Sequence, residues 1–194
     1  MSELGRGLHA DALRSLESWV APDAVQESWR AEYVAHLRRE PNGLAKACFP
    51  DHLTAGALVL DATGEKVLLN LHLKAQRWFA FGGHLEPEDD TLAAAALREA
   101  TEESGLPDLV LDPVPVHLSL HEVGFCNPRG TVRHLDVRFL ARLGATSEPV
   151  VSDESLDIQW FDVHDLPTDE PDMVDLIRLA RERLLAGVEP EARG

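Results

Sequence analysis

The stretch Gly82–Leu106, GGHLEPEDDTLAAAALREATEESGL, constrains this chain more than any other. It begins with two glycines, which let the backbone approach another group closely or adopt a positive φ. An acidic loop follows, and Asp90 is placed to cap a helix starting near Thr91, because a carboxylate accepts from first-turn N–H groups. Gly105 suits the left-handed position that ends a helix. The stretch therefore predicts a glycine loop followed by one helix.

Three glutamates share one face of this helix. At about 100° per residue, Glu103 lies near +40° and Glu102 near −60° from Glu99. The opposite side, which is expected to face the core, carries Ala93, Leu97 and Ala100. Like charges at this spacing destabilise an isolated helix by a few tenths of a kcal/mol per pair, so a bound cation is expected. Mg²⁺ or Mn²⁺ suits an all-oxygen carboxylate site.

The loop and helix resemble the signature of the Nudix hydrolase family. That pattern is a glycine, five residues, a glutamate, seven residues, then Arg-Glu-apolar-x-Glu-Glu-x-Gly-apolar. Arg98–Leu106 matches the second half position by position. The first half departs from it, because the glutamate position holds Asp89 when counted forward from Gly83 and Asp90 when counted back from Arg98. The loop is one residue longer, and either aspartate could be the acid that pairs with the arginine, as the resemblance implies.

The resemblance also implies an activity and a cofactor. The activity is hydrolysis of a diphosphate linkage in a nucleoside-diphosphate derivative, with Mg²⁺ or Mn²⁺. Glu99, Glu102 and Glu103 would hold the metal, and Arg98, Glu102 and Glu103 would be catalytic. Divalent ions in such a site can bind phosphate oxygens and activate a water for in-line attack on phosphorus.

The general base is left open among several acids. In the family it can be a glutamate of the signature helix or an acid on a distant loop. The distant candidates are Glu122, Asp136 and Glu154. Glu154, in the loop before the strand that carries Trp160, is the preferred one, and an exposed acid without a catalytic role is its equal alternative.

Substrate contacts are expected from residues outside the helix. The predicted set is Gly82, Gly83, His84, Glu86, Arg77 and Trp78. Arg77 could meet a phosphate. Trp78 could stack on a flat group or enter the core. Glu86 could support the metal's hydration shell or be a solvated loop acid.

The cysteines and histidines give weaker signals. Cys48 and Cys126 form no disulfide framework, indicate a reducing compartment, and are interpreted as small buried hydrophobes. Five histidines lie near predicted strands or loops without the spacing of zinc ligands: His52, His72, His84, His121 and His134.

Charge limits the partners. The net charge of −16, from 18 basic and 34 acidic residues, argues against nucleic-acid polymers and anionic membranes. An acidic protein that acts on phosphates needs cations at its site, which agrees with the helix. No apolar run approaches the ~20 residues of a membrane span, and no signal peptide is recognised, so a cytoplasmic protein with a small-molecule substrate is expected.

The order of elements indicates α/β or α+β layering. Two helices are predicted within residues 1–50, which could serve as a lid, the arm of a homodimer or, preferably, simple packing. Strands are predicted at 52–61, 66–73, 77–83, 114–123, 134–143 and 157–163, with a hairpin between the first two and a long connection through 127–130. A last helix is predicted near 173–185.

The resemblance specifies a mixed sheet sandwiched between helices. The expected division is an N-terminal helical extension (1–50), a Nudix hydrolase domain (51–187) and a loose tail (188–194). An alternative function on the same fold is a nucleotide-binding sensor module that does not hydrolyse its ligand, although such a module does not need all three glutamates. An isomerase of isopentenyl-diphosphate type is a weaker alternative, since it would place a cysteine and further ligands around the site.

Overall fold

The structure is a computed structural model of the 194-residue chain, and it describes residues 5–143, 148–151 and 155–187. Within these residues the helices are α1 (Arg6–Ser18), α2 (Ala24–Arg39), α3 (Leu92–Ser104) and α4 (Pro171–Gly187). The strands are β1 (Asp51–Leu60), β2 (Lys66–His72), β3 (Trp78–Phe79), β4 (Phe81–His84), β5 (Leu109–Leu111), β6 (His117–Asn127), β7 (Gly130–Leu143) and β8 (Ser155–Asp162). None of the described helices is long and apolar enough to cross a membrane.

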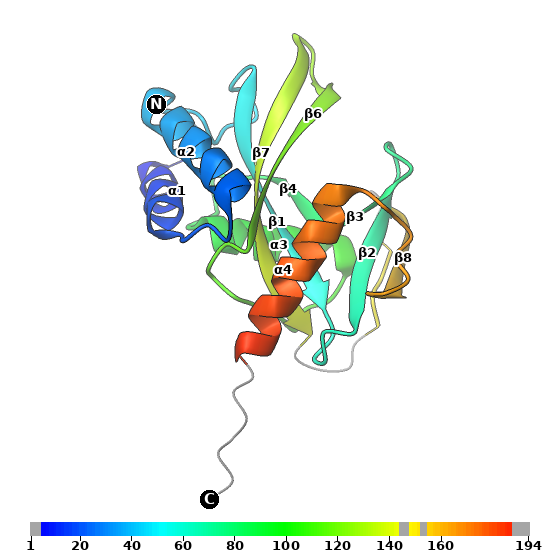
Figure 1. Ribbon diagram of the computed structural model, residues 1–194. Coiled ribbons are helices and arrows are strands. Elements are labelled where there is room, and N and C mark those ends of the chain that lie inside the picture. The colour runs from blue at the N-terminus through cyan, green and yellow to red at the C-terminus, as the bar shows by residue number, and fades with distance from the viewer. Residues whose placement is uncertain (1–4, 144–147, 152–154, 188–194) are drawn as a thin grey trace, which may run out of the picture.

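The described strands form one mixed sheet with β1 near its centre (Figure 1). β1 runs parallel to β7 along its whole length and antiparallel to β4 over residues 54–57. β2 continues the sheet and pairs with β3 and β8, while β7 also pairs with β5 and β6. The predicted fold class, a mixed sheet between helices, is confirmed.

Two details of the predicted strands were wrong. The segment 77–83 is two strands, since β3 pairs with β2 whereas β4 pairs with β1. The predicted long connection through 127–130 is a tight turn, in which the Asn127 side chain accepts from the N–H of Arg129 and Asn127 pairs with Gly130. The short strand β5 was not predicted, because three residues carry too little periodicity to be recognised.

Alternation along β1 explains how helices cover both faces of the sheet. Leu58 and Leu60 pack with the apolar face of α4, whereas Ala57 and Val59 pack with Ala100 of α3. Successive side chains of a strand point to opposite faces, so one strand serves both layers. Figure 1 shows α4 crossing one face, with α3 beyond the sheet.

α1 and α2 share the core of the sheet. Tyr33 is fully buried, and its hydroxyl donates to the carbonyl oxygen of Ser119 on β6. The Gln26 side chain donates to the Leu118 carbonyl oxygen at 3.0 Å and accepts from the Leu118 N–H at 2.7 Å. These contacts agree with the packing role predicted for the N-terminal helices.

α3 begins one residue later than predicted. Thr91 is the N-cap, and its hydroxyl accepts from the N–H of Ala94, so the prediction of Asp90 was wrong. Asp11 of α1 accepts from the Leu92 N–H at 3.0 Å and adds a negative charge at the helix N-terminus. Gly105 ends the helix with φ 67°, as predicted.

Candidate active site

Arg98 of α3 is the centre of a polar cluster between the helix and β4. Its guanidinium donates to three carboxylates: to Asp89 at 2.9 and 3.0 Å, to Glu99 at 3.0 Å and to Glu102 at 3.3 Å. A fourth contact reaches the carbonyl oxygen of His84 at 3.0 Å. The side chain is 19% exposed, so these bonds are largely shielded from water.

Asp89, and not Asp90, pairs with the arginine. Both carboxylate oxygens of Asp89 bind Arg98, and one of them also accepts from the N–H of Glu86 at 2.8 Å. Asp89 is buried and Asp90 is exposed. Hydrogen bonding to Asp89 raises the pKa of the Arg98 guanidinium above its ordinary value. The longer loop thus places the shorter acid at the position counted forward from Gly83.

Glu99 lies directly against the glycine loop. A Cβ added to Gly83 would come within 2.6 Å of the Glu99 carboxylate, so the glycine leaves room for this side chain in its present position. Gly82 has a different reason to be glycine, because its Cβ would come within 2.7 Å of the Gly56 Cα on β1. The two glycines therefore serve close packing within the protein.

Glu103 is the most buried of the three signature glutamates, at 8% exposure. One carboxylate oxygen accepts from the Gly82 N–H at 3.1 Å and from the Asn70 amide at 3.2 Å. Asn70 was missed by the sequence analysis, because it lies in an apolar strand far from the signature. Its recognition requires the pairing of β2 within the sheet.

The acid-bearing face of α3 turns toward the sheet more than the helical wheel predicted. Ala95 and Ala96, on the same side as Glu99 and Glu103, are fully buried. Glu102 remains 61% exposed. Asp89, Glu99 and Glu102 contact the guanidinium of Arg98, and Glu103 lies one helical turn after Glu99. With all four acids ionised, the formal charge of this set is −3, from −4 and +1. Such a set attracts a cation.

The predicted substrate contacts lie in different places. Arg77 forms an ion pair with Glu170 and is about half exposed. The Trp78 ring packs edge-on against Phe161, with ring centroids 4.7 Å apart, so it belongs to the side of the sheet that α4 covers. Glu86 is exposed in the loop. The contacts of Arg77 and Trp78 are therefore with other parts of the protein, whereas the backbone N–H of Glu86 donates to Asp89, the partner of Arg98.

The candidates for the general base also separate. Glu122 is exposed on β6, paired with Arg133 of β7 in the strand register. Asp136 is buried, where it accepts from Arg138 at 2.7 Å and from the Thr54 hydroxyl at 3.1 Å. Glu154 lies outside the described residues. Because Asp136 is held in an ion pair, it is poorly placed to accept a proton from water.

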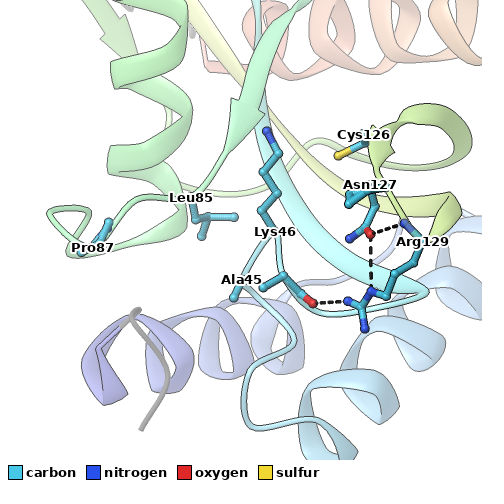
Figure 2. Close-up of a pocket in the computed structure, with 9 residues that line it drawn as sticks. Ala45, Lys46, Leu85, Pro87, Cys126, Asn127 and Arg129 are labelled. Atoms are coloured by element: carbon cyan, nitrogen blue, oxygen red, sulfur yellow. Dashed lines mark hydrogen bonds between the residues drawn. The ribbon is translucent and has the colours of Figure 1, made fainter.

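A pocket of about 500 Å³ lies beside the loop that follows His84 (Figure 2). The turn between β6 and β7 forms one wall and the segment before β1 another. Its lining residues are Ala45, Lys46, Ala47, Leu85, Pro87, Cys126, Asn127, Pro128 and Arg129. Lys46 and Arg129 give this pocket positive charge in a protein that is acidic as a whole.

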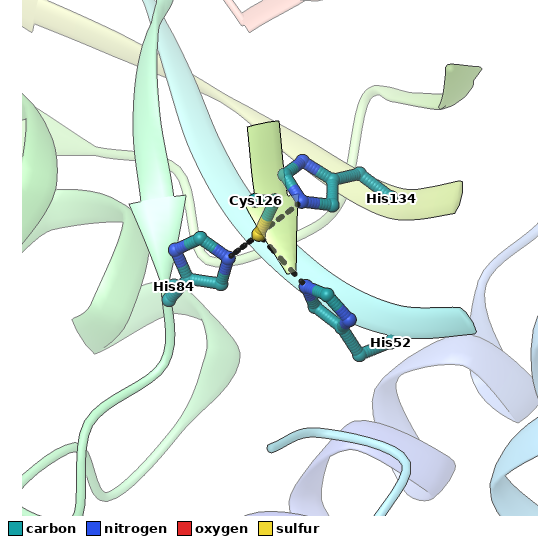
Figure 3. Close-up of side chains that lie close together, drawn as sticks. All are labelled: His52, His84, Cys126 and His134. Atoms are coloured by element: carbon teal, nitrogen blue, oxygen red, sulfur yellow. Dashed lines mark hydrogen bonds between the residues drawn. The ribbon is translucent and has the colours of Figure 1, made fainter. Parts of the chain in front are cut away.

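Three histidines and a cysteine come together on the far side of β4 from Glu99 (Figure 3). They are His52 of β1, His84 of β4, Cys126 of β6 and His134 of β7. Burial lowers the pKa of His84 to about 4 and that of His134 to about 3, so both rings are neutral at pH 7.

This cluster corrects two interpretations of the sequence. Three of the five histidines lie close enough together to hold a metal ion, and Cys126 is a half-buried member of this polar cluster, not a simple buried hydrophobe. The signal was missed because sequence spacing reveals zinc sites on one loop or helix, whereas these ligands come from four strands. Cys48 is buried, as predicted.

Comparison with known proteins identifies the fold. The chain is similar to the C. elegans Ap4A hydrolase in a binary complex (TM-score 0.58, 22% identity, 70% of this chain and 98% of that one). It is also similar to the E. coli dihydroneopterin triphosphate pyrophosphohydrolase (TM-score 0.54, 19% identity, coverage 68% and 95%). A third structure is the NUDIX domain of Shewanella oneidensis NrtR complexed with ADP ribose (TM-score 0.51, 24% identity, coverage 79% and 97%). At these identities the likeness concerns the fold alone.

The family follows from the sequence match. A search of curated protein sequences found no relative that matches the chain. The family model of the NUDIX domain matches residues 50–180, which is more than half of the chain and includes the whole cluster around Arg98. The chain therefore belongs to the Nudix family and is a pyrophosphohydrolase of the Nudix type.

Proposed function

We propose that this protein hydrolyses a diphosphate linkage in a nucleoside-diphosphate derivative and that it needs Mg²⁺ or Mn²⁺. The observation that carries the proposal is the fixed arrangement of Glu99, Glu102 and Glu103 beside Arg98 and the glycine loop. Nudix hydrolases generally use divalent metals. We infer Mg²⁺ or Mn²⁺ from the carboxylate donors of this site, and the class of substrate from membership of the Nudix family.

The donor set fits a hard divalent cation. All of its members are carboxylate oxygens, which Mg²⁺ and Mn²⁺ prefer. Because Gly83 has no side chain, the Glu99 carboxylate can lie directly beside β4. Glu102 is exposed and can reach an ion at the surface of the helix. We propose these three glutamates as the metal ligands.

The residues of the chain have separate tasks in this proposal. The bound ions would neutralise the diphosphate and supply an activated water. Arg98 fixes the Glu99 and Glu102 carboxylates, and the Gly82 N–H and the Asn70 amide fix Glu103. Ligands held in this way need no reorganisation when charge develops on the phosphate, which is the basis of electrostatic catalysis.

We further propose that the pocket beside the loop receives an anionic part of the substrate. Lys46 and Arg129 line this pocket, while Leu85 and Pro87 supply apolar surface (Figure 2). One structural neighbour is an Ap4A hydrolase and another is complexed with ADP ribose, and both molecules belong to the expected class, with several phosphates and a flat base. Lys46→Met should raise KM more than it lowers kcat, because a group that binds ground state and transition state equally changes KM.

A substrate panel tests the proposed function. The full-length protein is incubated with nucleotide sugars, dinucleoside polyphosphates, ADP-ribose and nucleoside triphosphates, with Mg²⁺ and then with Mn²⁺. We expect metal-dependent release of a nucleoside monophosphate or diphosphate from at least one class, and none after metal removal by chelation. Tight nucleotide binding without product from any class would instead establish the sensor module.

The carboxylate assignment has its own test. Glu103→Gln keeps the size of the side chain and its bonds to Gly82 and Asn70 but removes the charge, so turnover should fall by about 10²-fold or more. Glu182→Gln, on the exposed face of α4, is the matched control and should retain full turnover. Unchanged turnover in a pure, folded Glu103→Gln protein would overturn the assignment of Glu103 as a ligand.

A further inference from the structure

We propose that His52, His84, Cys126 and His134 bind a structural Zn²⁺ ion, at a site separate from the signature glutamates. The four side chains come from four strands, and one ligand atom of each lies within 4.8 Å of those of the other three. Figure 3 shows the three imidazole rings arranged around the Cys126 sulfur. Imidazole and thiolate are the ligands that zinc prefers, whereas Mg²⁺ and Mn²⁺ prefer oxygen.

The distances match those of a tetrahedral zinc site. The usual Zn–S and Zn–N bond lengths place the sulfur about 3.6 Å from each nitrogen of a tetrahedron. The Cys126 Sγ lies 3.3 Å from the His84 Nε2, 3.4 Å from the His134 Nε2 and 4.0 Å from the His52 Nε2. The sulfur–nitrogen distances therefore agree with such a site to within a few tenths of an ångström.

Hydrogen bonding alone explains the cluster poorly. A thiol has one proton, so it can donate to only one of the three nitrogens, and its sulfur accepts only weakly from the N–H groups of the other rings. His52 is fully buried, and its Nδ1 lies 3.2 Å from the Cys48 carbonyl oxygen, which can only accept. The Nδ1 must therefore carry the proton, and the lone pair of Nε2 points into the cluster. Metal-binding histidines typically donate from their other ring nitrogen to a carbonyl oxygen or carboxylate in this way.

Four protein ligands fill the coordination shell of zinc, which is the property of a structural site. The ion would tie the ends of β1, β4, β6 and β7 together. It would also fix the backbone of His84, whose carbonyl oxygen accepts from Arg98. Zinc would thereby support the geometry of the signature helix, and its four protein ligands would leave no coordination position for the substrate. Cys126 lines the pocket of Figure 2, which provides a route for the ion.

Metal analysis of the purified full-length chain, without a histidine tag, tests the proposal. After addition of zinc and dialysis against metal-free buffer, we expect about one zinc ion per chain by mass spectrometry of the elements. Replacement of zinc by Co²⁺ should produce a thiolate-to-cobalt charge-transfer band in the near ultraviolet. Zinc far below one ion per chain, or a cobalt spectrum without that band, would overturn the proposal.

Variants separate this site from the signature site. Cys126→Ser should lose the charge-transfer band. It should also bind zinc on the order of a hundredfold more weakly, because loss of a ligand weakens metal binding more than loss of a residue that hydrogen-bonds to a ligand. Cys48→Ser removes the other thiol, and His164→Ala removes an exposed histidine; both should keep zinc and the band.

Glu103→Gln distinguishes failure of this proposal from failure of the proposed function. It should retain zinc while losing turnover. Loss of zinc in Glu103→Gln together with full zinc in Cys126→Ser would place the ion among the glutamates and overturn the inference. The melting temperature adds a second readout, since zinc should raise it in the wild type and leave it unchanged in Cys126→Ser.

Discussion

Arg98 connects every part of the candidate active site at the level of single residues. It binds the loop through Asp89, the helix through Glu99 and Glu102, and β4 through the His84 carbonyl oxygen. An arginine can do this because its guanidinium presents five N–H donors in a fixed plane. A lysine would offer one point charge and could not hold the same arrangement.

The first prediction concerns the acid that pairs with Arg98. Asp89→Asn removes the charge and replaces one acceptor oxygen by a donor, so it should lower the free energy of unfolding by about 2 kcal/mol. It should also reduce turnover, because Glu99 and Glu102 lose their fixed partner. Asp90→Asn is the control, and it should stay within about 0.5 kcal/mol because the residue is exposed. Urea denaturation of both proteins provides the comparison, and equal stabilities would contradict the role of Asp89.

Residue patterns identified the signature acids but not their neighbours. The spacing of residues on one predicted helix was enough to identify Arg98, Glu99, Glu102 and Glu103. The choice between Asp89 and Asp90 does not, because it depends on how a loop with one extra residue folds back on α3. The histidine cluster is still less accessible, since His52 and His134 come together only through the parallel register of β1 and β7.

Among the secondary-structure elements, β4 separates two sites. Gly83 faces Glu99 of α3, while the next residue, His84, faces His52 and His134 on the other side. Alternation along a strand makes this division possible. The approach of β4 to β1 also depends on the facing pair Gly56 and Gly82, which leaves no space for a Cβ on either strand.

α4 is held on the sheet by a buried network of charges. Arg138 of β7 donates to Asp136 at 2.7 Å and to Asp172 of α4 at 2.6 Å, and the hydroxyl of Ser119 donates to Asp172 at 2.9 Å. Burial alone would raise the pKa of Asp136, but Arg138 holds it below its ordinary value. The network thus depends on one cation for two carboxylates.

The second prediction tests this network. Arg138→Met leaves Asp136 buried without its cation and should lower the free energy of unfolding by about 3–5 kcal/mol. Arg178→Met removes an exposed arginine of α4 that pairs with Asp175 and Glu182, and it should change stability by less than about 1 kcal/mol. Urea denaturation at neutral pH compares the two variants with the wild type.

The stability that Arg138→Met loses relative to the wild type should depend on pH. In the wild type the depressed pKa of Asp136 contributes stability above its unfolded pKa, and this contribution is lost as the pH falls through the folded pKa. In the variant that contribution is reversed, because burial raises the pKa of the unpaired acid. The deficit relative to the wild type should therefore shrink in acid, and a deficit that grows as the pH falls would contradict this account.

Element types were predictable where periodicity was long, and pairings were not. The spacing of apolar residues predicted the helices near 92–104 and 171–187 and the long strands β1 and β7. The division of 77–83 into β3 and β4 depends on which strands the two halves pair with, and the β6–β7 turn depends on a side-chain contact of Asn127. These are tertiary facts that local patterns do not contain.

In the whole molecule, the N-terminal helices and the Nudix domain share a hydrophobic core. Leu16 of α1 and Tyr33 and Leu37 of α2 are buried in one cluster with Leu53 of β1 and Leu118 of β6. The family match begins at residue 50, but the hydrophobic core does not end there. The start of the match therefore marks the limit of common ancestry and does not separate two independently stable units. We propose that residues 51–187 form the Nudix domain and that residues 1–50 complete its core.

The last prediction follows from this shared core. A chain of residues 51–194 would expose the apolar surface that α1 and α2 cover, and it would lose the Asp11 contact at the N-terminus of α3. We expect it to aggregate or to lack a cooperative unfolding transition, measured by circular dichroism during heating. A transition at the temperature of the full chain would contradict the proposal that residues 1–50 belong to the core.

A milder substitution keeps the test informative if the shortened chain cannot be purified. Tyr33→Phe removes only the hydroxyl that donates to Ser119 and should cost about 1–3 kcal/mol, since it leaves a buried carbonyl with one partner fewer. Val25→Ala, at an exposed position of the same helix, should stay within about 0.5 kcal/mol. If both variants unfold at the wild-type urea concentration, the hydrogen bond of the Tyr33 hydroxyl contributes nothing to the stability of the protein. A loss of stability confined to Tyr33→Phe would instead mean that α2, which lies outside the family match, stabilises β6. Because β6 carries Cys126, α2 would then also support the histidine cluster from a distance.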